Sequence, residues 1–297
     1  MTQERDNGRV PYPVYYNPEY VASEYAFDTT RKAGQLADRI ERGGSLATLV
    51  DPIEFVGPAE RVIERVHSPA YVEAVRSGNP TGLAESQGFD WDPKIATMAT
   101  AHSAGLVAAV TAVLSGPTRF AGSLSSGLHH ARRDKGAGYC TFNGLVVAAN
   151  AAIELGAERL LVLDLDAHCG GGTRSMTDPD SVVQIDVSTV GFDTWSPEGV
   201  DALLMARPDG YLAKVAEALR LADSAGTFDL VLYNAGMDPA NSGVSAADLK
   251  AREQMVAEWV RNREYRLVYA LAGGYTGYDL TMSDLVELHY LTVEAFG

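Results

Sequence analysis

The stretch ERLLVLDLDAHCGG at residues 158–171 decides the fold that we expect. It opens with an aliphatic run that has the length and composition of a buried strand, and it closes on acidic, histidine and glycine residues. Because side chains alternate along a strand, Asp164, Asp166 and His168 fall on the same side. Ligands of open α/β sheets bind outside the carboxyl ends of the strands, so this stretch predicts both a buried parallel strand and a functional site at its end.

Strand and helix signals alternate along the chain outward from this stretch. Apolar runs of strand length occupy 181–187, 228–236 and 265–274, and helical patterns occupy 94–116, 144–156, 211–226, 246–264 and 283–296. This alternation predicts an α/β fold: three layers, α/β/α, around a central, mainly parallel sheet. With 297 residues, and without an internal repeat or a long linker, we expect a single catalytic domain over residues 1–297.

Composition narrows the class of partner. The net charge of −15 argues against a nucleic-acid surface, and it suits either a cationic substrate or simple solubility. Cys140 and Cys169 form no CxxC pattern, so a disulfide framework is not expected. The N-terminus MTQERDNGRV has no apolar stretch of signal-peptide length, and no segment matches a membrane span. We therefore expect a cytoplasmic protein without a nucleic-acid or membrane partner.

Three residues have the chemistry of a metal site. Asp166 and His168 can bind one ion together, and Asp238, which follows another strand, completes a mixed oxygen and nitrogen set. Such a set suits one Zn²⁺ per chain and leaves a coordination position open, as catalytic zinc sites do. The alternative for Asp238 is a turn residue before Pro239, but its position at a strand end favours ligation.

A paired histidine and a tyrosine supply the remaining chemistry. His129 and His130 can move protons, and Tyr275 on a glycine-rich turn can donate a hydrogen bond to an oxyanion. The alternative for Tyr275 is packing beside the turn. Asp164 lies deeper in the apolar run, where a carboxylate is costly unless it is paired, so we expect it to support the site rather than bind the metal.

Four separated motifs resemble the histone deacetylase family, including its bacterial acetylpolyamine amidohydrolase relatives with the arginase/deacetylase fold. The motifs are HHARRDKGAGYCTFN at 129–143, LVLDLDAHCGG at 161–171, YNAGMDP at 233–239 and LAGGYTG at 271–277. They occur in the family's order, and the resemblance runs from about residue 66 to the C-terminus. It implies that His130 is the general acid/base nearer the leaving amine and that His129, held by Asp164, is an electrostatic partner of the metal-bound water.

The resemblance also implies the reaction: zinc-dependent removal of an acetyl or other acyl group from an acylated amine. The acylated amine could be an acetyl-lysine peptide, an acetylpolyamine or a small molecule. By the same resemblance, Gly138 and Tyr139 form one wall of a narrow acyl-amine channel, with Trp195 or Phe192 opposite. Asp164 and Ser188 match a monovalent-cation site, which adds K⁺ as an expected structural ion. The sequence is also compatible with a homodimer.

One position departs from the family pattern. Gly171 stands where relatives commonly carry an acidic or amide residue that orients the second histidine. We therefore expect His130 either to be a weaker base or to find another orienting group. Two other functions stay open: an acyl-amine binding protein that has lost catalysis, and an arginase-type ureohydrolase. Gly170 disfavours the ureohydrolase, which needs a second metal and an acid at that position.

Overall fold

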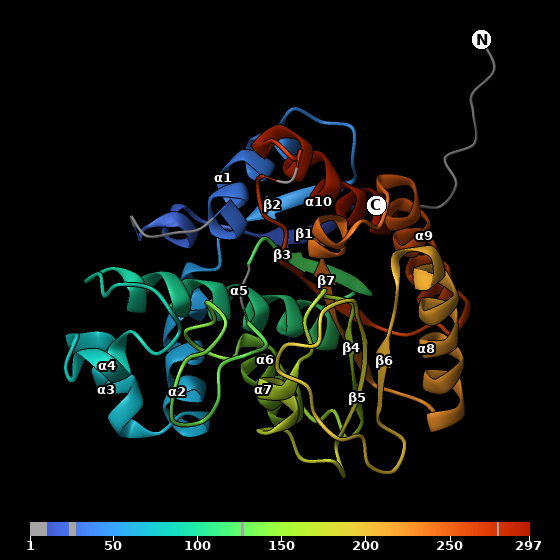
Figure 1. The fold of residues 1–297 in the computed structure, drawn as a ribbon. Coiled ribbons are helices and arrows are strands. Elements are labelled where there is room, and N and C mark those ends of the chain that lie inside the picture. Colours follow the sequence, from blue (N-terminus) through green and yellow to red (C-terminus); the bar gives the residue numbers. More distant parts are fainter. Residues whose placement is uncertain (1–10, 24–27, 126–127, 278) are drawn as a thin grey trace.

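The computed structural model describes residues 11–23, 28–125, 128–277 and 279–297. Its centre is an eight-stranded sheet in the order β2-β1-β3-β8-β7-β4-β5-β6, in which every pairing is parallel (Figure 1). The strands are β1 Tyr12–Tyr15, β2 Ala47–Val50, β3 Phe120–Ser123, β4 Leu160–Asp164, β5 Val182–Ser188, β6 Ala202–Met205, β7 Leu230–Gly236 and β8 Leu267–Ala272. The expected parallel α/β sheet is therefore confirmed.

Helices cover both faces of this sheet. The α-helices are α1 Asp28–Glu41, α2 Val56–Val66, α3 Pro69–Ser77, α4 Thr81–Ala84, α5 Ile95–Ser115, α6 Gly144–Glu154, α7 Gly171–Arg174, α8 Tyr211–Ala225, α9 Ala246–Asn262 and α10 Met282–Phe296. Short 3₁₀ turns are η1 Pro18–Val21, η2 Ile53–Phe55, η3 Pro208–Gly210 and η4 Asp238–Ser242. One hydrophobic core joins the sheet to α1, α8, α9 and α10, and the other joins it to α2, α3, α5 and α6.

Strand β4 shows why the sequence folds this way. Leu161 and Leu163 pack into the core on the α8–α9 side, whereas Leu160 and Val162 pack into the core on the α5–α6 side. All five residues of the strand are buried. A strand buried on both faces needs a continuous apolar run, and this requirement explains the pattern at 158–171.

The order of the strands brings distant segments together. Strands β3, β8, β7, β4 and β5 are neighbours in the sheet, although they span residues 120 to 272. Because they are parallel, the loops that follow them meet at one edge. Those loops carry the histidine pair after β3, Tyr275 after β8, Asp238 after β7 and His168 after β4. The topology therefore assembles the predicted site.

The expected strands and helices after residue 94 are all present, but three short strands had no clear signal. Strand β3 has the sequence FAGS, and its Gly122 lies where any Cβ would collide with the Tyr269 ring. Strands β2 and β6 lie at the two edges of the sheet and are partly exposed. Short strands that contain glycine or lie at an edge lack the apolar run that marks a central strand.

Helix α5 is long and apolar enough to cross a membrane by length and composition alone. However, 78% of its apolar 18-residue window is buried inside the fold, as expected for a core helix. The stretch MTQERDNGRV, on which the expectation about a signal peptide rests, lies outside the described residues.

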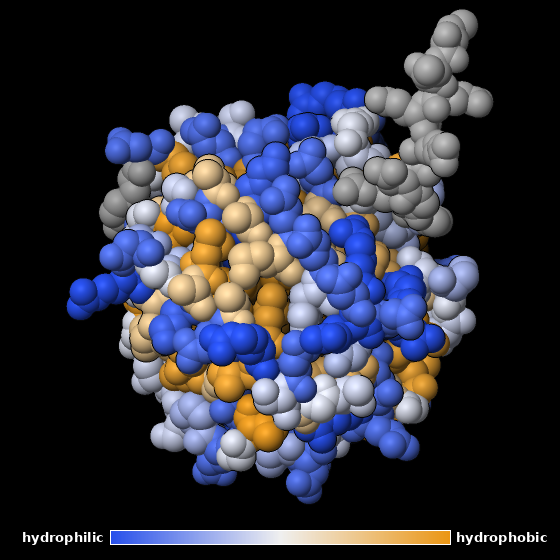
Figure 2. Space-filling view, turned by 90° about the vertical axis from the view of Figure 1, so that its right-hand side faces the viewer, coloured by the Kyte–Doolittle hydropathy of each residue, from blue (hydrophilic) through white to orange (hydrophobic). Residues whose placement is uncertain are grey.

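On the side of the molecule that carries α8 and α9, hydrophilic residues predominate and hydrophobic ones form smaller groups between them (Figure 2).

Candidate active site

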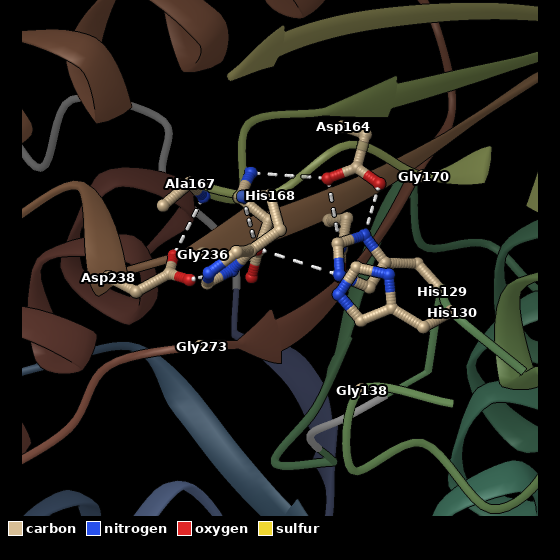
Figure 3. Close-up of polar contacts among 12 residues, drawn as sticks. His129, His130, Gly138, Asp164, Ala167, His168, Gly170, Gly236, Asp238 and Gly273 are labelled. Atoms are coloured by element: carbon tan, nitrogen blue, oxygen red, sulfur yellow. Dashed lines mark hydrogen bonds and ion pairs between the residues drawn. The ribbon is translucent and has the colours of Figure 1, made fainter. Parts of the chain in front are cut away.

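The three predicted metal ligands lie together at the carboxyl edge of the sheet. Figure 3 shows two of them, His168 and Asp238, facing each other there. One donor atom from each of Asp166, His168 and Asp238 lies within 4.8 Å of the others. His168 Nδ1 is 3.2 Å from Asp166 Oδ1 and 2.9 Å from Asp238 Oδ2. Both carboxylates are almost completely buried, at 2% and 1% exposure. The strand ends therefore bring the three donors into one cluster.

The chemistry of this cluster fits a divalent cation. Two buried carboxylates face one imidazole, and burial together with the charge of Asp166 raises the pKa of Asp238 to about 6. Apart from its contact with His168 Nδ1 at 2.9 Å, Asp238 Oδ2 has no hydrogen-bond partner in the part of the chain that the structure describes. Glycines line the cluster because a Cβ at Gly236 or Gly273 would collide with these carboxylates. Zinc commonly takes such an oxygen and nitrogen set.

His129 lies beside the cluster and is paired with Asp164. Its Nδ1 is 2.7 Å from Asp164 Oδ2, and its Nε2 is 3.5 Å from Asp166 Oδ1. Burial lowers the pKa of His129, but Asp164 and Asp166 outweigh that effect and raise it to about 10. Asn234 on β7 donates to Asp164 Oδ1 at 2.9 Å and so holds this carboxylate in place. The two carboxylates therefore favour the protonated form of His129.

His130 has the opposite electrostatic character. Its Nδ1 donates to Asp193 Oδ2 at 3.0 Å. Burial and the neighbouring charge of His129 lower the pKa of His130 to about 4, although Asp193 acts in the other direction. The two rings are 3.9 Å apart between centroids, so a positive charge on one ring disfavours a positive charge on the other. At neutral pH His130 is therefore free to accept a proton at Nε2.

Asp193 takes the place of the carboxylate that the sequence lacks at Gly171. It lies in the loop after β5, where Gly172 N donates to its Oδ2 at 2.9 Å and an Arg132 guanidinium N–H donates to its Oδ1. A Cβ at Gly171 would collide with the backbone and side chain of Asp193. The absence of a side chain at Gly171 thus leaves space for the Asp193 carboxylate, which belongs to the loop after β5.

Tyr275 is presented by a tight turn after β8. Gly273 and Gly274 adopt positive φ angles of 57° and 82°, which favour glycine. Asn241 holds the tyrosine backbone from both sides: its Oδ1 accepts from Tyr275 N and its Nδ2 donates to Tyr275 O, each at 3.0 Å. Burial, together with Asp238 and Asp166, raises the pKa of Tyr275, so its hydroxyl remains a donor.

A cavity of about 430 Å³ joins these groups. Its lining residues are Gln87, Gly88, His130, Gly138, Tyr139, His168, Val190, Phe192 and Tyr275. Gly138 packs closely against the His130 ring, and Phe192 lies edge-on to that ring with centroids 4.9 Å apart. Tyr139 and Phe192, two of the predicted channel residues, therefore both line this cavity.

Trp195 does not line this cavity, contrary to one of the two expectations for the opposite wall. Its indole Nε1 donates to Asp186 Oδ2 at 2.7 Å, which anchors the loop that carries Phe192 and Asp193. Ser188, the predicted cation-site residue, lies at the end of β5, where its hydroxyl donates to the His168 carbonyl at 3.2 Å. The potassium site at Asp164 and Ser188 stays a prediction.

A buried arginine holds the strands that carry two of the predicted metal ligands. Arg252 on α9 has no exposed surface and donates to the Leu165 carbonyl at 3.2 Å and to the Gly236 carbonyl at 2.6 Å. Leu165 immediately precedes Asp166, and Gly236 lies two residues before Asp238. Glu253 balances the charge, with its Oε1 2.5 Å from the guanidinium. The strand ends are thus tied to one rigid group beneath the cluster.

Sequence reasoning missed Asp193 and Asn234. Asn234 gives a signal in retrospect, since it is a polar residue inside the buried run LVLYNAG of β7. Asp193 gives none, because it lies in an irregular loop whose path depends on the whole fold. Its φ of 57° reflects that unusual backbone.

The family described as "Histone deacetylase domain" matches residues 27–194. An uncharacterized protein of Picosynechococcus sp. is 28% identical over 305 residues, which cover 94% of this chain and 96% of that relative. Histone deacetylase 2 of Arabidopsis thaliana is 28% identical over 174 residues, and polyamine deacetylase HDAC10 of Homo sapiens is 34% identical over 140. These matches cover 52% and 42% of this chain, but only 43% and 20% of the two relatives.

Solved structures share the fold. The HD domain of HDA15 has a TM-score of 0.76 at 18% identity, covering 96% of this chain and 90% of that chain. Acetylpolyamine aminohydrolase from Burkholderia pseudomallei has a TM-score of 0.75 at 17% identity, covering 96% and 98%. At these identities the likeness concerns the fold alone. Because the family match at 27–194 spans more than half of the chain, this protein belongs to the histone deacetylase family.

Proposed function

We propose that this chain is a zinc-dependent deacylase that hydrolyses the amide bond of an acylated amine. One observation carries the proposal: a single cavity is lined by a metal-ligand candidate, His168, a neutral histidine, His130, and a hydroxyl donor, Tyr275. Amide hydrolysis needs these three functions at one carbonyl carbon. Relatives named for deacetylation of histones and of polyamines support the reaction class.

The residues divide the proton chemistry by their electrostatics. His130, with its pKa lowered to about 4, takes a proton from water at Nε2 and delivers it to the leaving amine. Asp193 fixes its tautomer by accepting from Nδ1. His129, with its pKa raised to about 10, stays protonated and offers positive charge to the developing oxyanion. Tyr275 donates its hydroxyl hydrogen to the same oxygen.

Asp166, His168 and Asp238 would hold the zinc. When bound, zinc supplies a Lewis acid that polarises the amide carbonyl and acidifies a water molecule. The cavity walls Tyr139 and Phe192 suit an extended methylene chain, such as the stem of acetyl-lysine or an acetylated polyamine. The net charge of −15 also favours the approach of a cationic substrate.

A substrate panel tests the function. Zinc-loaded protein is given acetyl-lysine peptide, acetylputrescine and acetylspermidine, and the release of free amine is measured. We expect activity that is lost when a chelator removes the metal and returns when zinc is added. The variant Asp238→Asn should bind less zinc and lose activity with it.

A binding protein without catalysis is the second candidate, because Gly171 stands where the resemblance leads us to expect the residue that orients His130. That function predicts stoichiometric zinc binding and acyl-amine binding with no release of amine from any panel member. Turnover that persists after complete metal removal would contradict the zinc mechanism itself.

A further inference from the structure

The turn that presents Tyr275 packs directly against the turn that carries Asp238. The two turns follow β8 and β7, which are neighbours in the sheet. The backbone joins them where the strands end, since Met237 N donates to the Ala272 carbonyl at 3.0 Å. A Cβ at Gly273 would collide with the Asp238 carboxylate. The predicted metal ligand and the predicted oxyanion donor therefore belong to two turns in close contact.

Asn241 links these two turns through both polar atoms of its side-chain amide. It belongs to η4 Asp238–Ser242, in the turn that begins with the predicted metal ligand. Its Oδ1 accepts a hydrogen bond from Tyr275 N, and its Nδ2 donates one to Tyr275 O, each at 3.0 Å. Two hydrogen bonds from one planar amide fix the orientation of the Tyr275 backbone as well as its distance.

The chain around Tyr275 depends on such contacts for its shape. Strand β8 ends before this point, and α10 begins after it. Gly273 and Gly274 precede the tyrosine with positive φ angles, and glycine has the greatest backbone freedom of any residue. A side chain that follows two glycines needs contacts from outside the turn to hold it in one place, and Asn241 supplies two of them.

The position of the Tyr275 hydroxyl decides how well it stabilises an oxyanion. Donors of this kind act at about 2.7–3.1 Å from the oxygen on which charge develops. A displacement of about 1 Å can cost about 10²-fold in rate. Tyr275 lines the same cavity as His130 and His168, whereas Asn241 is not among the described residues of that lining. Asn241 therefore acts on the reaction through the residue that it holds.

We propose that Asn241 is a positioning residue, which holds the Tyr275 backbone so that the tyrosine hydroxyl can reach the oxyanion. This inference rests on the proposed function and goes beyond it, because it assigns the placement of the oxyanion donor to a residue outside the cavity. It also ties that placement to the turn of Asp238. The contribution of Asn241 to the rate should disappear once the hydroxyl of Tyr275 is absent.

A double-mutant cycle tests the inference on zinc-loaded full-length protein. The variants are Asn241→Leu, which has a similar size and no polar side-chain atoms, Tyr275→Phe, and the two combined. Asn262→Leu, at an exposed position of α9, is the control for the change from asparagine to leucine. The substrate is whichever of acetyl-lysine peptide, acetylputrescine and acetylspermidine is hydrolysed fastest. Bound zinc is measured in every variant.

We expect Asn241→Leu to lower kcat about 10- to 100-fold and to change KM less than about threefold. In the Tyr275→Phe background the same substitution should change kcat less than about twofold, because no hydroxyl is left to place. Asn262→Leu should match wild type. A merely structural role would multiply the two losses, so multiplicative losses overturn the inference. Turnover of Asn241→Leu at the wild-type rate, or a fall in kcat that only follows a loss of bound zinc, also overturns it.

Hydrogen exchange separates this inference from the proposed function. Tyrosine residues are labelled with ¹⁵N, and the Tyr275 resonance is identified by its absence from Tyr275→Phe. Asn241→Leu removes the acceptor of the Tyr275 N–H, so this N–H should exchange with solvent about tenfold faster, the value of one hydrogen bond. If no substrate is hydrolysed, the proposed function fails, and the exchange rate then decides whether Asn241 holds Tyr275. An unchanged exchange rate overturns the inference in either case.

Discussion

His130 Nδ1 donates to Asp193 Oδ2 across 3.0 Å, although 63 residues separate the two in the chain. The carboxylate that orients this histidine therefore comes from the loop after β5, not from the segment that carries the predicted metal ligands Asp166 and His168. Arg132 and the backbone of Gly172 hold Asp193 in turn. Removing the carboxylate should affect the chemistry of His130 more than the fold.

The first prediction concerns Asp193→Asn. We expect kcat/KM to fall about 10- to 100-fold, as for other residues that orient an active-site histidine. Asp193 favours the charged form of His130, so its loss lowers the pKa of His130 further. The limb of the pH–rate profile that reports His130 should then move to lower pH. Asp209→Asn, at an exposed position, is the control, and a uniform loss of rate without any shift of this limb would contradict the role.

The second prediction concerns Gly171→Asp, which places a carboxylate at the position where the family resemblance led us to expect one. The new Cβ would collide with Asp193. We expect a loss of stability of about 1–3 kcal/mol, typical of overpacking, together with reduced activity. Thermal unfolding and the amine-release assay measure the two effects.

The double variant Gly171→Asp with Asp193→Gly relieves that collision and returns a carboxylate to the neighbourhood of His130. Glycine also suits the positive φ of 57° at position 193. We expect the double variant to be more stable and more active than Gly171→Asp alone. Additive losses in the double variant would show that the two positions do not share one space.

The sequence predicts most of this architecture because the decisive signals are local. The strand at 160–164 must be apolar on both faces, and the acid and histidine that follow it are two residues apart. Such patterns depend only on the periodicity of a strand. The parallel topology then places Asp238 and Tyr275 at the same edge without further information.

The remaining features depend on tertiary packing. Phe192 and Trp195 are equivalent as aromatic residues of one loop, and only the folded structure shows that Asp186 holds the indole of Trp195 away from the cavity. Asp193 reaches His130 because that loop turns back over Gly171. Irregular loops have no periodicity from which their path could be predicted.

The third prediction concerns Tyr275→Phe. Removing the hydroxyl deletes one donor to the oxyanion, which should lower kcat about 10²- to 10³-fold. KM should change little, because the donor acts mainly on the transition state. Tyr139→Phe is the matched control, since Tyr139 is 41% exposed on the cavity wall. A comparable loss of kcat in both variants would argue against a specific role for Tyr275.

The fourth prediction concerns Lys32, a lysine of α1 with no exposed surface. Its Nζ donates to the Gly273 carbonyl at 3.0 Å, on the turn that presents Tyr275. Burial lowers its pKa from 10.5 to about 7, although Asp238 and Asp166 act in the other direction. Between pH 7 and pH 10.5, Lys32 is therefore protonated to a greater extent in the unfolded chain than in the folded protein.

Stability should therefore rise as pH increases from 7 towards 10.5, by up to about 1.4 kcal/mol per pH unit from this group. Lys32→Met removes the contribution, so the gap in unfolding free energy between wild type and variant should change in favour of wild type as pH rises. Urea unfolding at pH 7, 8 and 9, in one metal state throughout, measures that gap, with the exposed Lys250→Met as control. A gap that stays constant with pH would mean that Lys32 remains protonated in the fold, and that Asp166 and Asp238 compensate fully for its burial.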